Sequence, residues 1–341
     1  MTKAWKVAAL ASLASLGIAA SASADVRYAE PNGDGDQVTC SQSDPCGLID
    51  AIESPFAVDG DEVVVLPGVY SLGNEILLID NELNVHGAPG NFSAGRPTIV
   101  GSHDFGLIDV SSDGARVADL ELDHNGEFFA LIVDGQAVVE RLIVRSAATD
   151  GACHVAAQEN AAVIRDSVCL NEGGGPAVRV QPDLFVDPGN ATLRNVTAIS
   201  NGSHPGILGA ALNDGALNLD VLNTIASGGP GADDVVASDE SASDPASLVL
   251  GNSNYDTASA DANSSVTAPG TGTNQMAPPL LTNIEGAFAQ LAGSPTIDAG
   301  AADPLLGSLD ILGEPRIQGP APDIGADETA NPPDTTAPGL R

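Results

Sequence analysis

The chain has almost no lysine and only one tryptophan. Its two lysines, Lys3 and Lys6, and its tryptophan, Trp5, all lie within the first 24 residues, and beyond them ten arginines stand against 46 aspartates and glutamates. Nucleic acid, anionic membranes and polyuronate chains all need clustered positive charge on their partner. The composition therefore excludes nucleic-acid binding. It favours attraction of cations or basic partners, or simply the solubility of an exported protein.

The first 24 residues have the pattern of a secretory signal peptide. Two lysines precede the apolar run 7–20, and residues 21–24 end in an Ala-x-Ala-like site. This run is short for a bilayer span, and no later apolar run is long enough for one. We therefore expect cleavage near Ala24 and a secreted or cell-surface protein. Its net charge would be about −36, the formal −34 of the whole chain less two lysines.

Five similar six-residue segments recur in the middle of the chain. They begin at Val117, Val139, Ile164, Leu193 and Leu219, at intervals of 22, 25, 29 and 26 residues. The alternation of apolar and polar residues within each segment indicates short strands, and a Gly-containing turn soon follows most of them. A repeat of this length is typical of a solenoid. The sequence therefore predicts an all-β fold, a single-stranded parallel β-helix.

Four cysteines lie beyond the signal peptide, and none belongs to a Cys-x-x-Cys pair. In an oxidising compartment two disulfides are expected, and three pairings are possible. Spacing favours the local pairing, in which Cys40 joins Cys46 in a short loop. Cys153 would then meet Cys169 across the interior of one coil.

The remaining segments indicate how the solenoid begins and ends. Residues 25–60 are predicted to form an N-terminal cap, in which an amphipathic helix over 47–53 covers the open edge of the first coil. The β-helix body is expected over 61–328, with a closing segment from about 280 to 328. Residues 329–341 are rich in proline and threonine and are predicted to be a linker or tail.

Motifs at both ends of the chain resemble known families. Tyr28-Ala-Glu-Pro-Asn-Gly33, the small cysteine loop and Gly60-Asp-Glu-Val-Val-Val-Leu-Pro-Gly-Val-Tyr70 resemble the opening of exported right-handed parallel β-helix proteins of the pectate-lyase-like superfamily. Gly293-Ser-Pro-Thr-Ile-Asp-Ala-Gly300, Asp310-Ile-Leu-Gly-Glu-Pro-Arg-Ile317 and Pro322-Asp-Ile-Gly-Ala-Asp-Glu328 are similar to the C-terminal pattern of choice-of-anchor Q proteins, although Asp327 replaces the more usual aromatic residue. The resemblance implies a right-handed β-helix and export, and it implies no particular activity.

Candidate catalytic groups are few. A polysaccharide lyase needs a base, often an arginine, for which Arg145 and Arg179 are the candidates. A glycoside hydrolase needs two nearby carboxylates, for which the doublet Asp233 and Asp234 is the candidate, although a solvated turn explains the doublet equally. We assign no catalytic residue.

Three other arginines, Arg141, Arg165 and Arg194, occupy similar places in successive repeats. We interpret them as a structural ladder flanked by polar neighbours. Exposed ion pairs of this kind are expected to contribute little to stability.

Two segments partly fit calcium motifs. Residues 228–236, with Asp233 as a ligand, match a calcium-binding nonapeptide that normally occurs in tandem arrays. Asn32, Asp34 and Asp36 hold the first, third and fifth positions of a calcium loop that lacks its glycine and its closing glutamate. Turn formation explains both segments. We assign no metal site and no cofactor, and calcium stays an open alternative.

The leading functional hypothesis is a non-catalytic, secreted or cell-surface β-helix for adhesion, display or contact with carbohydrate or the cell envelope. The expected partner is an extracellular polysaccharide or an envelope component, and the expected state is a monomer. The alternative is a polysaccharide lyase or glycoside hydrolase of the β-helix type. A third hypothesis is a structural module that calcium stabilises.

Overall fold

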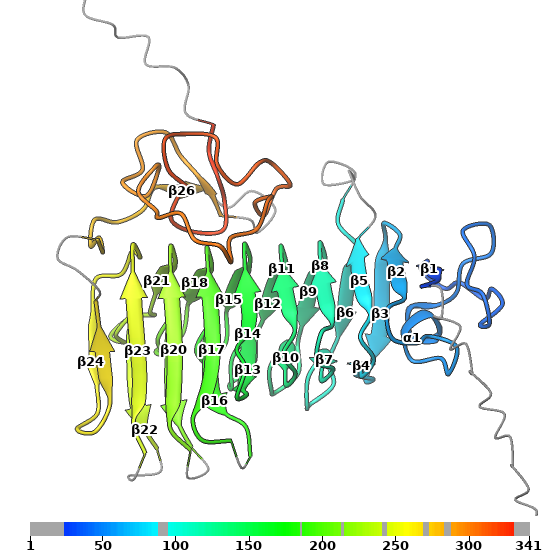
Figure 1. Ribbon diagram of the computed structural model, residues 1–341, viewed down its shortest axis with the longest axis horizontal. Helices are drawn as coiled ribbons and strands as arrows, with labels where there is room; N and C mark the ends of the chain where they lie inside the picture. The colour runs from blue at the N-terminus through cyan, green and yellow to red at the C-terminus, as the bar shows by residue number, and fades with distance from the viewer. Residues whose placement is uncertain are drawn as a thin grey trace, which may run out of the picture.

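The computed structural model describes residues 24–87, 95–184, 186–212, 215–240, 244–268, 273–282 and 288–330. The predicted signal peptide, apart from Ala24, and residues 331–341 of the predicted tail lie outside these ranges. Three parallel sheets run side by side along the molecule, here numbered in the order in which the chain enters them within one coil (Figure 1).

The strands of the three sheets have the following bounds. Sheet 1 consists of β1 (Val26–Ala29), β2 (Glu62–Val65), β5 (Asn84–Gly87), β8 (Arg116–Ala118), β11 (Val138–Glu140), β14 (Ala162–Arg165), β17 (Gly189–Arg194), β20 (Leu217–Leu222), β23 (Ala246–Gly251) and β25 (Ser265–Thr267). Sheet 2 consists of β3 (Val69–Gly73), β6 (Thr98–Gly101), β9 (Glu121–His124), β12 (Ile143–Ser146), β15 (Val168–Asn171), β18 (Thr197–Ser200) and β21 (Ile225–Ser227). Sheet 3 consists of β4 (Leu77–Ile79), β7 (Ile108–Val110), β10 (Leu131–Val133), β13 (Cys153–Ala157), β16 (Val178–Pro182), β19 (Ile207–Ala211), β22 (Val235–Asp239) and β24 (Ala258–Ala260). Outside these sheets lie the helix α1 (Leu48–Ile52) and the antiparallel pair β26 (Leu281–Thr282) and β27 (Ala289–Gln290).

The chain passes through sheets 1, 2 and 3 in turn and then steps to the next coil, which confirms the predicted parallel β-helix. Inward side chains of equivalent strands stack on one another in register. In sheet 1 one such column is formed by Val117, Val139, Ile164, Leu193 and Val221, each at most 1% exposed. Burying each of these side chains contributes about 1.5–3 kcal/mol. The columns therefore form a continuous apolar core along the solenoid.

The repeated six-residue segments each cover a corner between two strands. In the first of them, Val117 lies in β8, Asp119 turns the chain with a φ of 61°, and Leu122 lies in β9. The predicted interval of 26 residues between the fourth and fifth segments was wrong. Leu193 pairs with Val221, 28 residues later, and not with Leu219. Leu219 also faces inward on the same strand, so alternation alone could not separate the two registers.

From β8 onward, the corner that follows each described strand of sheet 1 up to β23 is made by one residue in the left-handed region. Asparagine and aspartate adopt this conformation more readily than most residues. The residues in this corner column are Asp119, Arg141, Asp166, Asn195, Asn223 and Asn252, with φ between 42° and 61°.

The predicted arginine ladder is wrong in its register. Arg141 is a corner residue, whereas Arg165 and Arg194 lie one position earlier and pair with each other across β14 and β17. In the preceding strand, β11, the residue at their position is Glu140, which forms ion pairs with Arg116, Arg141 and Arg165. Burial alone would raise the pKa of Glu140, but the three arginines lower it to about 2. This cluster is a mostly buried ion-pair network.

The closing segment does not continue the coils. Residues 288–330, which include its three motifs, fold back along the corner column and lie over the ends of the sheet 1 strands (Figure 1). The corner amides hold its backbone: Asn195 donates to the carbonyl of Asp323 at 2.8 Å and Asn223 to that of Ala301 at 2.8 Å. Asn252 donates to the carbonyl of Ala299 at 3.1 Å. Each asparagine corner therefore also serves as a docking point.

An apolar contact and a buried ion pair complete this docking. Ile143 and Val168, on the outer face of sheet 2, pack against Ile311 and Ala326 of the closing segment. Arg316 Nη2 lies 2.8 Å from Asp166 Oδ1, and both side chains are at most 2% exposed. An arginine and an aspartate in the same low-dielectric space stabilise one another only as a pair.

The motif residues of the closing segment hold a fold with little secondary structure. Arg316 donates to the carbonyls of Gly325 and Ala326. The carboxylate of Asp310 accepts hydrogen bonds from the backbone amides of Leu312, Glu314 and Glu328. Side-chain carboxylates therefore replace the strand ladder as partners for these backbone groups.

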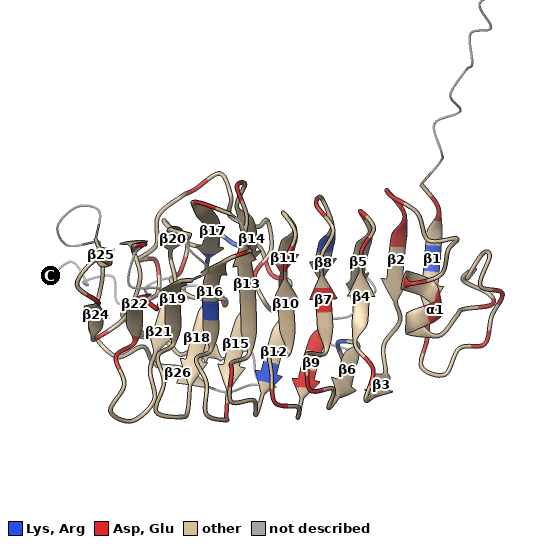
Figure 2. Ribbon diagram, turned by 90° about the horizontal axis from the view of Figure 1, so that it is seen from below, with Lys and Arg blue, Asp and Glu red and all other residues tan. Residues whose placement is uncertain are grey.

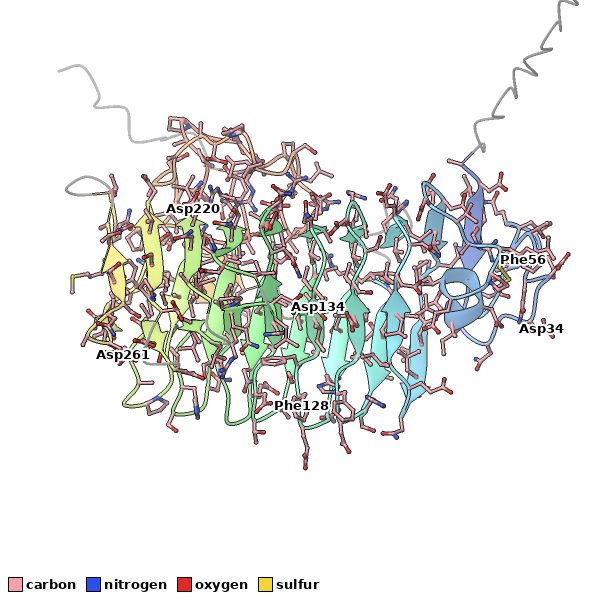
Figure 3. All side chains as sticks on the ribbon, turned by 60° about the horizontal axis from the view of Figure 1, so that its bottom comes forward. Asp34, Phe56, Phe128, Asp134, Asp220 and Asp261 are labelled. Atoms are coloured by element: carbon pink, nitrogen blue, oxygen red, sulfur yellow. A yellow bond between two sulfur atoms is a disulfide. The ribbon has the colours of Figure 1, made fainter. Side chains whose placement is uncertain are left out.

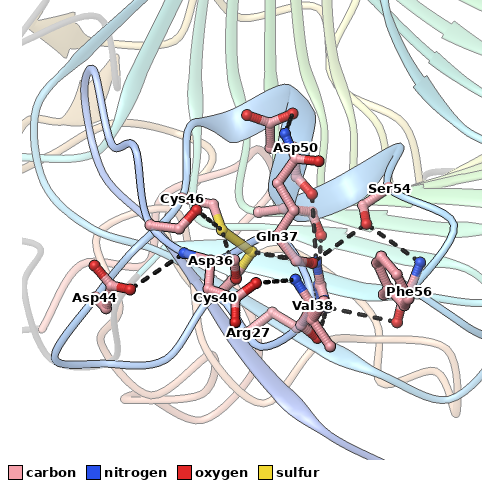
Figure 4. The surroundings of a disulfide bond; sticks show 12 residues. Arg27, Asp36, Gln37, Val38, Cys40, Asp44, Cys46, Asp50, Ser54 and Phe56 are labelled. Atoms are coloured by element: carbon pink, nitrogen blue, oxygen red, sulfur yellow. Dashed lines mark hydrogen bonds between the residues drawn. A yellow bond between two sulfur atoms is a disulfide. The ribbon is translucent and has the colours of Figure 1, made fainter.

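The N-terminal cap is built around a buried arginine (Figure 4). Arg27 is 1% exposed and donates to the carbonyls of Ala51 and Gln37, both at 2.9 Å. The predicted helix is confirmed as α1, which buries Leu48, Ala51 and Ile52. β1 is already the first strand of sheet 1, so the cap and the first coil share a sheet.

Both disulfides have the local pairing. Cys40 joins Cys46 in the cap, and Cys153 of β13 joins Cys169 of β15 across the interior of a coil, with Cα atoms 6.1 Å apart. Within the described part of the chain, no helix is long and apolar enough to cross a membrane.

The buried ion pair predicts a large difference between two arginine substitutions. Arg316→Met leaves Asp166 buried without its cation, so we expect the free energy of unfolding in urea to fall by about 3–5 kcal/mol. The control Arg145→Met removes the partly exposed partner of Glu121 and should cost at most about 1 kcal/mol. Equal losses in the two variants would contradict a docking role for Arg316.

The carboxyl groups of the closing segment predict a stability that falls as pH rises. Burial raises the pKa of Asp166 and Asp310 to about 6 and that of Glu328 to about 7. A raised pKa in the folded state means that protonation stabilises folding. This stabilisation is complete below the ordinary values of 3.8 and 4.5 and is lost as pH rises through 6 to 7.

We therefore expect a higher melting temperature at pH 5 than at pH 8. Because the net charge also changes with pH, the decisive quantity is the difference between variants. Glu328→Gln should reduce the change in melting temperature between the two pH values, even if the loss of one hydrogen bond lowers both temperatures. Glu172→Gln removes an exposed charge and should leave the change intact. Identical pH profiles for all three proteins would count against this account.

Candidate functional site

A groove of about 440 Å³ lies on the outer face of sheet 3, over the middle coils. Its aromatic wall comes from the turns that lead into sheet 3, and its polar floor comes from the strands β13 and β16 and from the turn after β10. In Figure 3, Phe128 projects at the lower edge of these coils and Asp134 lies on the face above it. The groove therefore combines an apolar wall with charged groups.

The wall begins with two stacked phenyl rings. Phe105 and Phe128 each precede by three residues the first residue of their sheet 3 strand, and those first residues, Ile108 and Leu131, pair in register. The ring centroids are 5.6 Å apart, with planes inclined by 22°. Phe105 is 66% exposed and Phe128 is 37% exposed. The stack therefore presents aromatic surface to solvent.

A third ring closes the wall from inside. Phe129 stacks on His154 with a centroid distance of 4.5 Å. Gly151, in the next coil, lies against the ring of Phe129 and has a φ of 142°. A Cβ atom added at Gly151 would lie only 2.8 Å from this ring. Burial, aided by Arg179, lowers the pKa of His154 to about 4. Its imidazole is therefore neutral at neutral pH, and its buried Nε2 has no hydrogen-bond partner among the residues that the structure describes.

Arg179 is the cation of the groove. It lies on β16, next to His154 in the sheet, and its Nε donates to Gln181 Oε1 at 3.0 Å. Its Nη2 lies 3.0 Å from Glu240 Oε2. These two contacts fix the guanidinium, and Glu240 balances its charge.

The acidic side of the groove lies at Asp134. Burial, together with the charges of Asp109 and Asp183, raises the pKa of Asp134 to about 6. Burial also raises the pKa of Asp109, whose buried Oδ1 has no hydrogen-bond partner in the described part of the chain. These carboxyl groups are therefore poorly solvated and repel one another.

A second, wholly polar trough of about 660 Å³ continues from Asp134 along the turns between sheets 3 and 1. It includes Asp80, Asp113 and Asp183. Acidic residues are spread widely over the loops, whereas basic positions are few (Figure 2). The groove is thus the end of an acidic surface that meets an aromatic wall.

The predicted enzyme candidates do not come together. Arg179 lies in the groove, whereas Arg145 lies on sheet 2 and pairs with Glu121. Asp234 caps a turn, because its carboxylate accepts hydrogen bonds from the amides of Gly228, Asp256 and Thr257. Its neighbour Asp233 belongs to the same turn and does not line the groove. The doublet therefore has a structural role at Asp234.

The calcium candidates Asn32, Asp34 and Asp36 lie in the N-terminal cap, and Asp34 is visible at the cap end in Figure 3. Asp36 accepts a hydrogen bond from the amide of Val38, and Asn32 has a φ of 58°, as in a turn. Over the described ranges, no three His, Cys, Asp or Glu side chains gather in a way that could hold a metal ion. A calcium role for these residues stays a prediction.

The aromatic wall is not predicted from the sequence. Phe105 and Phe128 are 23 residues apart, the same interval that separates Ile108 from Leu131. Two phenylalanines separated by the local repeat length are a detectable signal once the register of sheet 3 is known.

Comparison with known proteins reveals one kind of likeness. No family model matches the chain, and no curated protein matches it. Among solved structures the chain is similar to the pectate lyase Pel9A, with a TM-score of 0.47 and 14% sequence identity, over 89% of this chain and 96% of that one. The β-helix fold of the present chain is established by its own sheet topology.

Proposed function

We propose that this protein is an exported, cell-surface β-helix that binds an extracellular saccharide without cleaving it, in the groove on sheet 3. The observation that carries the proposal is the exposed stack of Phe105 and Phe128 beside a polar floor. Sugar rings present apolar C–H faces that pack on aromatic rings, while a few polar groups fix their orientation.

The polar floor suits this role because it is rigid. Arg179 is held between Gln181 and Glu240, so little side-chain entropy remains to be lost when it meets a sugar hydroxyl. Ligand hydroxyls would have acceptors at Asp134 and donors at Arg179. The arrangement supports binding along the strand stack, across successive coils.

The closing segment supports the surface location. Its three motifs resemble the choice-of-anchor Q pattern, and they pack together: Asp323 accepts from the amide of Asp298, and Asp310 accepts from that of Glu328. The signal-like N-terminus and the two disulfides favour export. We propose that this segment belongs to that type of C-terminal element.

Binding should depend on the aromatic wall. Phe128→Ala removes half of the exposed stack, and burial of a phenylalanine is worth about 1.5–3 kcal/mol. We therefore expect affinity for a bound oligosaccharide to fall by about tenfold or more, measured by calorimetry on ligands found with a glycan array. Phe56→Ala, in the cap, removes a phenylalanine that is 49% exposed and should bind normally. The proposal fails if no saccharide binds the wild-type protein.

A second candidate function is glycoside hydrolysis, favoured by one observation. Asp134, with its pKa near 6, lies close enough to Asp109 and Asp183 for their charges to raise that pKa. Hydrolases use such a pair, one carboxyl protonated and one ionised. If the groove is catalytic, neutral polysaccharides will be cleaved, and Asp134→Asn will abolish cleavage while keeping the melting temperature. Absence of any cleavage across a polysaccharide panel would eliminate this candidate.

A further inference from the structure

The charge around the groove restricts the ligands that it can accept. Glu240 balances Arg179, and the imidazole of His154 is neutral at neutral pH. Asp134 and Asp150 line the groove, and Asp109 lies beside its floor on the neighbouring strand β7. None of these three carboxyl groups forms an ion pair within the described part of the chain. The groove therefore carries excess negative charge in a partly dry setting.

Apart from Arg179, whose charge Glu240 balances, no described side chain that lines the groove brings a positive charge to these carboxyl groups. Among the described residues, Asp109 Oδ1 has no hydrogen-bond partner although it is buried. Burial disfavours the ionised forms of Asp109 and Asp134, and the charge of Asp109 adds to this effect at Asp134. A cation entering the groove would relieve both effects, because opposite charge nearby favours the ionised carboxylate. A uronate would add to the repulsion.

The aromatic wall also accepts cations. The face of a phenyl ring is negative, and an ammonium group within about 6 Å of the ring centre is attracted to it. Phe105 and Phe128 lie in the turns that precede β7 and β10, and Asp109 lies on β7 while Asp134 follows β10. Ring faces and carboxylates thus come from the same two coils.

We propose that the groove selects saccharides with free ammonium groups, such as non-acetylated amino sugars, over neutral and uronic saccharides. This inference rests on the saccharide-binding function proposed above and names its ligand class. An amino sugar offers an apolar ring face to the phenyl stack and an ammonium group to the carboxylates. Hydroxyl groups remain for Arg179 and Gln181.

The test compares three hexasaccharides of equal length by calorimetry at pH 6.5. They are β-1,4-linked glucosamine, its fully N-acetylated form, and galacturonate. We expect the cationic hexamer to bind about tenfold more tightly than the acetylated one, and the uronate not to bind. If the acetylated hexamer binds as tightly as the cationic one, the ligand class is wrong and saccharide binding stands. If no hexamer and no glycan-array ligand binds, both proposals fail.

Variants separate the groove from general attraction to an acidic protein. Asp134→Asn should weaken binding of the cationic hexamer about fivefold or more. It should weaken binding of the acetylated hexamer by less, because the asparagine carbonyl still accepts a hydrogen bond from a hydroxyl group. Asp256→Asn removes an exposed charge in the last coils and should change neither affinity. Asp150→Asn serves as a second groove variant in case Asp134→Asn impairs folding. If all three variants bind the cationic hexamer like the wild type, the attraction is diffuse and the inference is overturned.

Discussion

The structure depends on a corner that turns at a single residue. A β-helix must change direction between sheets without moving the apolar positions of the next strand to the outside, and one residue with positive φ achieves this between sheets 1 and 2. Asparagine and aspartate tolerate that conformation, and their short polar side chains remain outside the core. In Asn195 and Asn223 the same side chain then binds the backbone of the closing segment. The residue type needed for the turn therefore also provides the docking surface.

The corner column changes its chemistry along the molecule. At its start Asp119 and Arg141 pair with one another, at a distance of 2.7 Å, and Arg141 also pairs with Glu140 of the preceding strand position. At Asp166 the partner is Arg316 of the closing segment. One outward-facing position of sheet 2 changes in the same way along the molecule. It is the charged Glu121 in β9, and it is apolar at Ile143 and Val168, which pack against the closing segment. The closing segment is thus required by the apolar outer face of the later coils.

The sequence predicted the repeat, the helix α1 and the local disulfides, because each depends on neighbours along the chain. It failed where equivalent or neighbouring residues are identified only by the pairing register of the strands. Leu219 and Val221 both face inward, so only pairing with Leu193 identifies the equivalent residue. The groove was missed for a related reason. Phe105 and Phe128 are neighbours only through the stacking of β7 on β10, and the charged groups beside them are defined by burial, which composition does not reveal.

The excess of acidic residues has more than one physical role. In the closing segment and at Asp234, carboxylates accept hydrogen bonds from backbone amides that no strand ladder satisfies, so acidic side chains stabilise irregular backbone. At Glu140, three arginines compensate one carboxylate and lower its pKa to about 2. At Asp109 and Asp134 the described residues supply neither kind of compensation, although burial is substantial. Uncompensated carboxylates cost stability, and their position beside an exposed aromatic stack distinguishes this face of sheet 3 from the rest of the acidic surface.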